Sequence, residues 1–100
     1  MSVALGIDVG TRSVKVIAYD ADSRTCVDSA SSPLALHQTS DGVAEQNAEW
    51  WIDALKVALA SLNQSSRQAI AAIGVSGQQH GFVPVDKNGI VLAPVKLWCD

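Results

Sequence analysis

A polar segment near the start of the chain combines residue types that bind phosphate groups. Gly10 allows a ligand to approach the backbone closely, and Thr11 and Ser13 add hydroxyl donors. Arg12 and Lys15 supply positive charges that suit phosphate oxygens. This segment, the 10–15 hairpin, therefore predicts a phosphate-binding turn. It is not a Walker loop, because the GxxxxGK[ST] pattern is absent.

A carboxylate directly precedes this hairpin. Asp8 shares one face of a predicted strand with the small residues Ala4 and Gly6, while large apolar residues occupy the other face. A single carboxylate in this position could hold Mg²⁺ through water, because magnesium keeps much of its hydration. The alternative interpretation is that Asp8 caps the turn and that the neighbouring cations are solvated, as in many short glycine-containing hairpins.

A second polar segment, the 74–81 loop, follows an apolar run. Gln78, Gln79 and His80 can both donate and accept hydrogen bonds, as a polyhydroxylated ligand requires, and the flanking glycines let the backbone bend. In open α/β sheets, ligands bind beyond the carboxyl ends of the strands, which favours this position. His80 could equally be a turn histidine with a purely structural hydrogen bond.

Alternating apolar residues predict the strands that carry the hairpin. The polar run 21–24 predicts a turn, and Pro33 either ends the third strand or marks an edge position. The polar run 37–46 predicts a loop. The strands predicted before the first helix are 3–9, 14–20 and 25–30.

A helix is predicted after Asn47, which suits an N-cap, and Glu49 and Asp53 suit the positive end of its dipole. Polar residues 63–66 break the helical pattern. The apolar stripe expected to cover the sheet consists of Trp51, Ile52, Leu55, Ala58, Leu59 and Leu62.

The last third of the chain predicts further strands. Residues 69–76 are apolar on both faces, as in a buried central parallel strand, and an Asn-Gly turn at 87–89 joins strands 82–86 and 90–93. An antiparallel meander, a helical crossover and a parallel strand together predict an α/β fold with a mixed sheet.

Composition excludes several classes of protein. The net charge of −3 and the scattered cations argue against a nucleic-acid surface. No apolar stretch approaches the roughly 18 residues needed to span a bilayer, and the N-terminus has no signal-peptide pattern. Cys26 and Cys99 lie far apart outside any CxxC pattern, which predicts reduced thiols in a cytoplasmic protein.

Four segments together resemble a known family. Residues 6–15, 45–51, 73–81 and 91–100 resemble, in order and spacing, motifs in the N-terminal part of the FGGY carbohydrate kinases. The resemblance covers essentially the whole chain and is strongest to the xylulokinase branch. It implies an actin-like, ribonuclease H-like fold of two domains, with ATP and sugar bound between them. Residues 1–100 would then form the N-terminal portion of the first domain, and the second domain would lie outside this chain.

The resemblance also implies roles for particular residues. Asp8 matches the family aspartate that lies near Mg²⁺ and the transferred phosphoryl group. The general base would lie beyond residue 100, and a homodimer is the assembly expected of the full-length protein. Residues matching the ATP-phosphate site are Gly10, Thr11, Arg12, Ser13 and Lys15; those matching the sugar site are Gln79, His80 and Trp98.

The activity implied is ATP- and Mg²⁺-dependent phosphorylation of a ketopentose, D-xylulose to D-xylulose 5-phosphate. Arg12 stands where the family often has a small hydroxylated residue, Gln79 where methionine is usual and Cys99 where asparagine is frequent. These differences concern the sugar more than the reaction. Two alternatives remain: an FGGY kinase for another polyol or sugar acid, and a non-catalytic actin-like nucleotide-binding protein.

Overall fold

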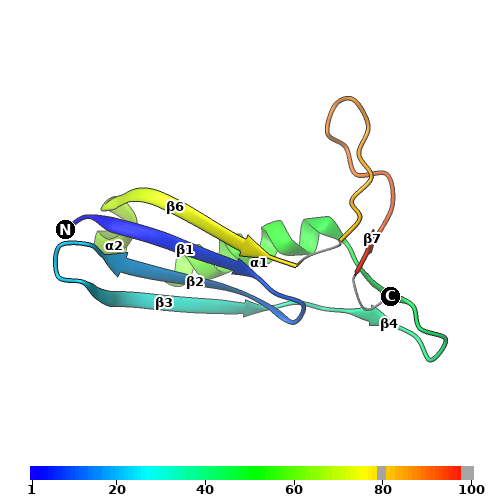
Figure 1. Cartoon of the computed structure of the whole chain (residues 1–100), viewed down its shortest axis with the longest axis horizontal. Helices are drawn as coiled ribbons and strands as arrows, with labels where there is room; N and C mark the ends of the chain where they lie inside the picture. Colours follow the sequence, from blue (N-terminus) through cyan, green and yellow to red (C-terminus); the bar gives the residue numbers. More distant parts are fainter. Residues whose placement is uncertain (79–80, 98–100) are drawn as a thin grey trace.

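The computed structural model describes residues 1–78 and 81–97. Two β-sheets and two helices make up this part of the chain (Figure 1). The elements are β1 (Val3–Val9), β2 (Ser13–Asp20), β3 (Thr25–Pro33), β4 (His37–Gln38), β5 (Ala44–Gln46), α1 (Ala48–Ser61), α2 (Gln64–Gln68), β6 (Ile70–Gly77) and β7 (Val95–Lys96).

The larger sheet has the strand order β3-β2-β1-β6. β1 pairs with β2, and β2 with β3, in antiparallel orientation, whereas β1 and β6 run parallel. The two helices form the crossover from the meander to β6, because parallel neighbours cannot be joined by a tight turn. The predicted mixed α/β fold is confirmed, and Pro33 is the last residue of an edge strand as predicted.

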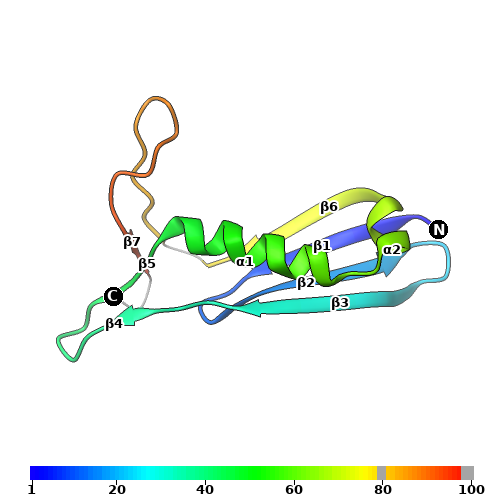
Figure 2. The ribbon, with the colours of Figure 1, turned by 180° about the vertical axis from the view of Figure 1, so that it is seen from behind.

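The main core lies between this sheet and α1, which packs across β2 and β3 (Figure 2). Val14 and Val16 are fully buried on the face of β2 that meets the helix. Ala54 and Ala58 face them, and their small side chains allow the helix to lie close to the sheet. Of the predicted helical stripe, Leu55, Ala58, Leu59 and Leu62 belong to this core, whereas Trp51 packs against a second, smaller cluster of Ala44, Val95 and Leu97. Ile52 is 53% exposed, because α1 is rotated to bury the alanines.

Both helices begin at asparagine caps. Asn47 Oδ1 accepts a hydrogen bond from the Glu49 main-chain N–H at 2.9 Å, which confirms the predicted N-cap of α1. Asn63 Oδ1 accepts from the Ser66 N–H at 2.8 Å and starts α2. The prediction that residues 63–66 only end a helix was thus incomplete, because the same polar residues start the next one.

Residues 37–46 do not form the loop that their polarity predicted. β4 and β5 pair with each other, and β5 also pairs with β7, so that Gln46 lies opposite Val95. All three strands are very short, and β7 lies about fifty residues after β5 in the chain. Such a distant pairing leaves no local pattern in the sequence.

β6 is parallel to β1 as predicted, but it is not a buried central strand. Within the described residues it forms an edge of the larger sheet, and Ile73 and Val75 are 61% and 70% exposed. Their partners on β1, Leu5 and Ile7, are buried on the same face. The difference arises because α1 covers β2 and β3 rather than β6.

The segment 82–93 contains the predicted turn but only isolated bridges instead of two strands. Val85 bridges Val91, and the Gly89 N–H donates to the Asp86 carbonyl at 3.0 Å. Gly89 has φ +79°, a conformation that glycine adopts without strain. Gly89 is therefore the last residue of the turn that begins at Asp86, and not one of its two central residues.

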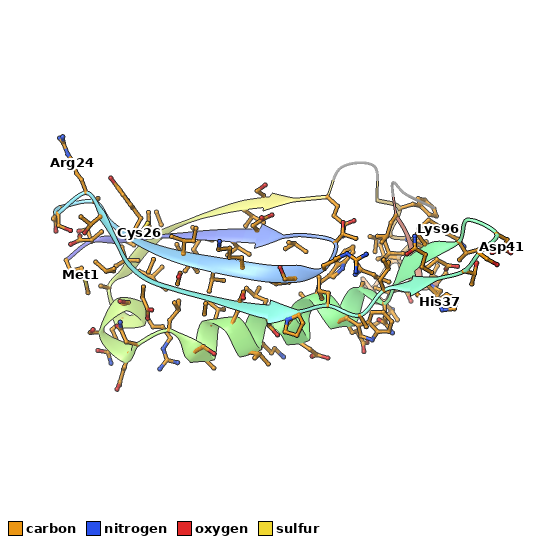
Figure 3. All side chains as sticks on the ribbon, turned by 90° about the horizontal axis from the view of Figure 1, so that it is seen from below. Met1, Arg24, Cys26, His37, Asp41 and Lys96 are labelled. Atoms are coloured by element: carbon orange, nitrogen blue, oxygen red, sulfur yellow. The ribbon has the colours of Figure 1, made fainter. Side chains whose placement is uncertain are left out.

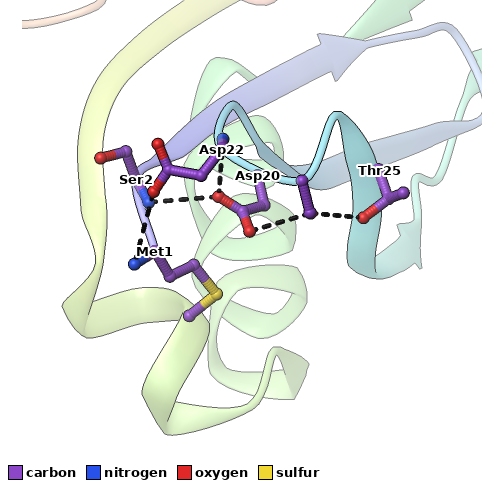
Figure 4. A network of polar contacts seen from close by, with 6 residues as sticks. Met1, Ser2, Asp20, Asp22 and Thr25 are labelled. Carbon is purple, nitrogen blue, oxygen red and sulfur yellow. Dashed lines mark hydrogen bonds and ion pairs between the residues drawn. The ribbon is translucent and has the colours of Figure 1, made fainter.

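Asp20 stabilises the end of the larger sheet where β1 begins and β2 ends (Figure 4). Its carboxylate accepts hydrogen bonds from the Ser2 and Asp22 N–H groups and from the Ser23 hydroxyl. Figure 3 shows this end, with Met1, Arg24 and Cys26, far from the end that carries His37, Asp41 and Lys96. Cys26 is a free and exposed cysteine, and Cys99 lies outside the described residues.

Candidate active site

The face of the larger sheet opposite α1 carries three polar side chains in register. Asp8 on β1 lies opposite Lys15 on β2 and opposite Ser76 on β6. Asp8 and Lys15 are exposed, and strand alternation places all three on the face that the helix leaves open. A negative charge, a positive charge and a hydroxyl are thereby brought together from three strands.

A depression of about 540 Å³ lies on this open face. Gly6 and Gly74 are partners across β1 and β6, and neither contributes a side chain that would fill it. Its lining residues are Gly6, Ile7, Asp8, Lys15, Ile17, Gly74, Val75 and Ser76. The sheet therefore offers an open, glycine-floored surface beside Asp8 rather than an enclosed cavity.

The 10–15 hairpin turns tightly at the end of this surface. The Gly10 N–H donates to the Ser13 carbonyl at 2.9 Å, and a Cβ atom at Gly10 would lie only 3.1 Å from the same oxygen. The Arg12 carbonyl accepts from the Leu34 N–H at 2.8 Å, which attaches the tip to the segment after β3. The turn is thus held in one conformation, with Thr11 and Ser13 partly exposed and Arg12 exposed.

A buried glutamine supports the hairpin from behind. Gln46 is 1% exposed, and its Nε2 donates to the carbonyls of Thr11 at 2.7 Å and Ala35 at 2.8 Å. Its Oε1 accepts from the Trp51 indole N–H at 2.9 Å. Buried polar groups are retained when their hydrogen bonds are satisfied, as they are here.

The described part of the 74–81 loop joins this network through Gln78. Gln78 Nε2 donates to the Gly10 carbonyl and to Gln46 Oε1, both at 3.2 Å. Gln78 Oε1 is buried and has no partner among residues 1–78 and 81–97. Gln78 also lines a pocket of about 240 Å³, together with Val9, Trp51, Gly77, Gly81, Val83 and Leu97.

The structure brings together the predicted phosphate-site residues at one end of the sheet. Asp8 and Lys15 lie on the open face, and the hairpin tip follows directly. Gln79, His80 and Trp98, the residues predicted for a sugar, lie outside the described residues. Gln46 and Trp51 were not predicted as site residues, because a glutamine before an N-cap carries no sequence signal that it is buried.

The side chains around Asp8 fit a magnesium ion that is held mainly by water and phosphate oxygens. Among residues 1–78 and 81–97 there is no group of three or more His, Cys, Asp or Glu side chains that could enclose a metal ion. Mg²⁺ in phosphoryl-transfer sites needs only one or two carboxylates, because water and phosphate oxygens complete its coordination. The single exposed carboxylate of Asp8, beside an open surface, fits that requirement.

Two carboxyl groups with lowered pKa values, those of Asp20 and Asp41, lie away from this site. Burial raises the pKa of Asp20, but the hydrogen bonds from Ser23, Asp22 and Ser2 and the N-terminal charge outweigh it, so that the pKa lies below its usual 3.8. A hydrogen bond from the Thr39 hydroxyl is the main cause that lowers the pKa of Asp41. Asp20 ends β2 and Asp41 lies in the turn between β4 and β5, so neither carboxylate is next to Asp8 or Lys15.

The fold and its hairpin match the actin-like ATPase fold of solved kinase structures. A "xyloylose kinase" from Brucella ovis superposes with a TM-score of 0.90 at 34% identity, over 98% of this chain and 21% of that one. A gluconate kinase from Lactobacillus acidophilus gives a TM-score of 0.83 at 29% identity, over 99% of this chain and 20% of that one.

Residues 3–100 match the FGGY family of carbohydrate kinases, N-terminal domain, and the chain belongs to this family. Xylulose kinase from Haemophilus influenzae is 40% identical over 96% of this chain and 21% of its own length. The chain thus spans about a fifth of the length of this relative. None of the helices in the described part of the chain is long and apolar enough to cross a membrane.

Proposed function

We propose that this chain is the N-terminal part of the first domain of an ATP- and Mg²⁺-dependent kinase that phosphorylates a ketopentose, D-xylulose, to its 5-phosphate. Family membership supports the reaction class. Curated relatives named xylulose kinase, at 40% and 41% identity, support the substrate. The observation that carries the proposal is the alignment of Asp8 and Lys15 beside a glycine-floored surface and a tight polar hairpin.

In this proposal the hairpin holds the phosphates of ATP. Thr11 and Ser13 supply hydroxyl donors, Gly10 allows a phosphate to approach the backbone, and Arg12 and Lys15 balance the negative charge. Phosphoryl transfer depends mainly on positioning and charge stabilisation, which is what such a rigid, cationic turn provides.

Asp8 would hold Mg²⁺ through water at the edge of the same surface. When bound, the ion would neutralise charge that develops on the phosphate oxygens. Gln79, His80 and Trp98 would contact the sugar, and the general base and the adenosine pocket would come from residues beyond 100. We further propose that the full-length enzyme is cytoplasmic and forms a homodimer.

A second candidate is a kinase of the same family for another polyol or for a sugar acid. The match to a gluconate kinase structure at 29% identity favours this alternative. Gln79 also stands where xylulokinases usually have methionine, so that an added amide would face the sugar. An amide can donate to a carboxylate or hydroxyl group that a thioether cannot bind well.

The proposal is tested with the purified full-length enzyme. ADP release is measured in a coupled assay with ATP, Mg²⁺ and a panel of D-xylulose, D-ribulose, L-ribulose, glycerol and gluconate. The highest kcat/KM with D-xylulose is the expected result, and a higher value with gluconate would establish the second candidate. ATP binding without phosphorylation of any sugar would instead indicate a nucleotide-binding protein.

A further inference from the structure

Gln46 stands out among the buried residues of this chain. It is the bulkiest of the fully buried side chains in the described part, and four of the five next in size are valines. It is the last residue of β5 and lies opposite Val95 of β7. An uncharged amide in such a position needs a specific set of partners, because its polar atoms have left water.

The partners of Gln46 allow only one orientation of its amide. The Thr11 and Ala35 carbonyls are acceptors and must face Nε2, whereas the Trp51 indole is a donor only and must face Oε1. A flipped amide would oppose acceptor to acceptor and donor to donor at all three contacts. Gln46 therefore acts as a rigid connector with a defined polarity.

A second amide extends this connector to the 74–81 loop. The ladder between β1 and β6 ends at the pair Val9 and Gly77, and both strands then continue into polar segments. Just beyond that pair, Gln78 Nε2 bonds both the Gly10 carbonyl and Gln46 Oε1. Through the two amides, the 10–15 hairpin and the 74–81 loop remain attached after the sheet has ended.

We propose that Gln46 is a positioning residue that fixes the separation between the 10–15 hairpin and the 74–81 loop. This inference rests on the proposed function, in which the first segment holds ATP phosphates and the second holds the sugar. Gln46 itself is buried behind the hairpin and acts through Thr11, Gly10 and Gln78. Its effect is on the alignment of the sugar hydroxyl with the transferred phosphoryl group, since small misplacements lower kcat strongly.

The test uses the full-length enzyme with three variants: Gln46→Met, Gln78→Met and the double variant. Methionine keeps a similar length but removes the amide. Gln38→Met, at an exposed position of β4, is the matched control for the substitution itself. Leu62→Ala, in the core at the other end of α1, is the control for lost stability, which is compared as Tm.

We expect kcat at saturating ATP and sugar to fall at least tenfold in Gln46→Met, while Kd for sugar alone and for nucleotide alone changes less than threefold. The kcat loss of the double variant should be no greater than that of the single variant with the larger loss, because both substitutions break one connected network. Leu62→Ala should keep kcat within twofold despite a lower Tm. The inference is overturned if the kcat losses of the two single variants multiply, or if kcat simply follows Tm across all variants.

Hydrogen exchange separates this inference from the proposed function. Gln46→Met should speed the exchange of the amides in residues 10–13 and 76–78 at least tenfold, and Leu62→Ala should leave that exchange unchanged. If the wild-type enzyme phosphorylates no sugar, the proposed function is wrong, and the exchange rates alone decide whether Gln46 holds the two segments together. Unchanged exchange in Gln46→Met would refute the connection.

Discussion

Replacing Asp8 by asparagine removes one negative charge from the open face and almost nothing else. The side chain is exposed and lies opposite Lys15 and Ser76 at the end of β1. Exposed substitutions of this kind usually change the free energy of unfolding by less than about 0.5 kcal/mol. We therefore expect Tm of the full-length enzyme to stay the same while turnover falls.

The size of the loss in turnover follows from the charge. Two unit charges 4 Å apart interact by about 4 kcal/mol at an effective dielectric constant near 20, and by about 1 kcal/mol in water. Asp8 lies beside an open surface that would be covered only when the substrates are bound. For the charge interaction that Asp8→Asn removes, we take about 2.7 kcal/mol, between these limits. This energy corresponds to about a hundredfold in kcat.

The assay is steady-state kinetics with varied sugar, ATP and Mg²⁺, combined with calorimetric titration of the sugar. Asp8→Asn should lower kcat about a hundredfold and leave Kd of the sugar within about twofold, because the proposed function assigns sugar binding to other residues. Asp53→Asn, at an exposed position of α1, is the control with the same chemical change. A kcat within threefold of wild type, or a sugar Kd that rises in step with the loss of kcat, would refute the role of Asp8.

Three further predictions concern other parts of the chain. His80→Ala should raise KM for the sugar about tenfold with KM for ATP unchanged, since an unpaired hydroxyl costs about 1–3 kcal/mol; an ATP defect with normal sugar binding would contradict it. Asp20→Asn should lower Tm at pH 7, and because the folded-state pKa lies below 3.8, the difference should vanish as the pH falls from about 4 through that pKa; a difference that persists in acid would contradict it. Residues 1–100 alone should associate through the exposed Ile73 and Val75 of β6 and show no kinase activity; light scattering and a coupled assay would detect a monomeric, active fragment.

Local patterns predicted much of the larger sheet and of α1. The alternation of large and small residues defines β1 and β2 to within one residue, because each side chain of a strand must face either the core or the open face. The same alternation placed Asp8 on the small-residue side. Asn47 marked the start of α1, since its cap requires only the next few residues.

Local patterns did not predict the burial of residues whose exposure depends on which strands α1 covers. Ile52 belongs to the apolar stripe by spacing, yet α1 turns its alanines toward β2 and leaves Ile52 exposed. β6 is apolar on both faces, yet α1 lies over other strands and leaves Ile73 and Val75 exposed. The sequence predicts that a segment can be buried, whereas the packing of the whole sheet decides whether it is.

For the site, the sequence by itself determined the chemistry of the 10–15 hairpin and its place at a strand end. It did so because glycine, hydroxyl and cationic residues lie there within a few positions of one another. Only the tertiary structure decided that Asp8, Lys15 and Ser76 share one face of three strands and that Gln46 supports the hairpin. Ser76 lies 68 positions after Asp8, and Gln46 lies 35 positions after Thr11. No local pattern can encode such contacts, because they form only when β5, β6 and the hairpin meet in the folded chain.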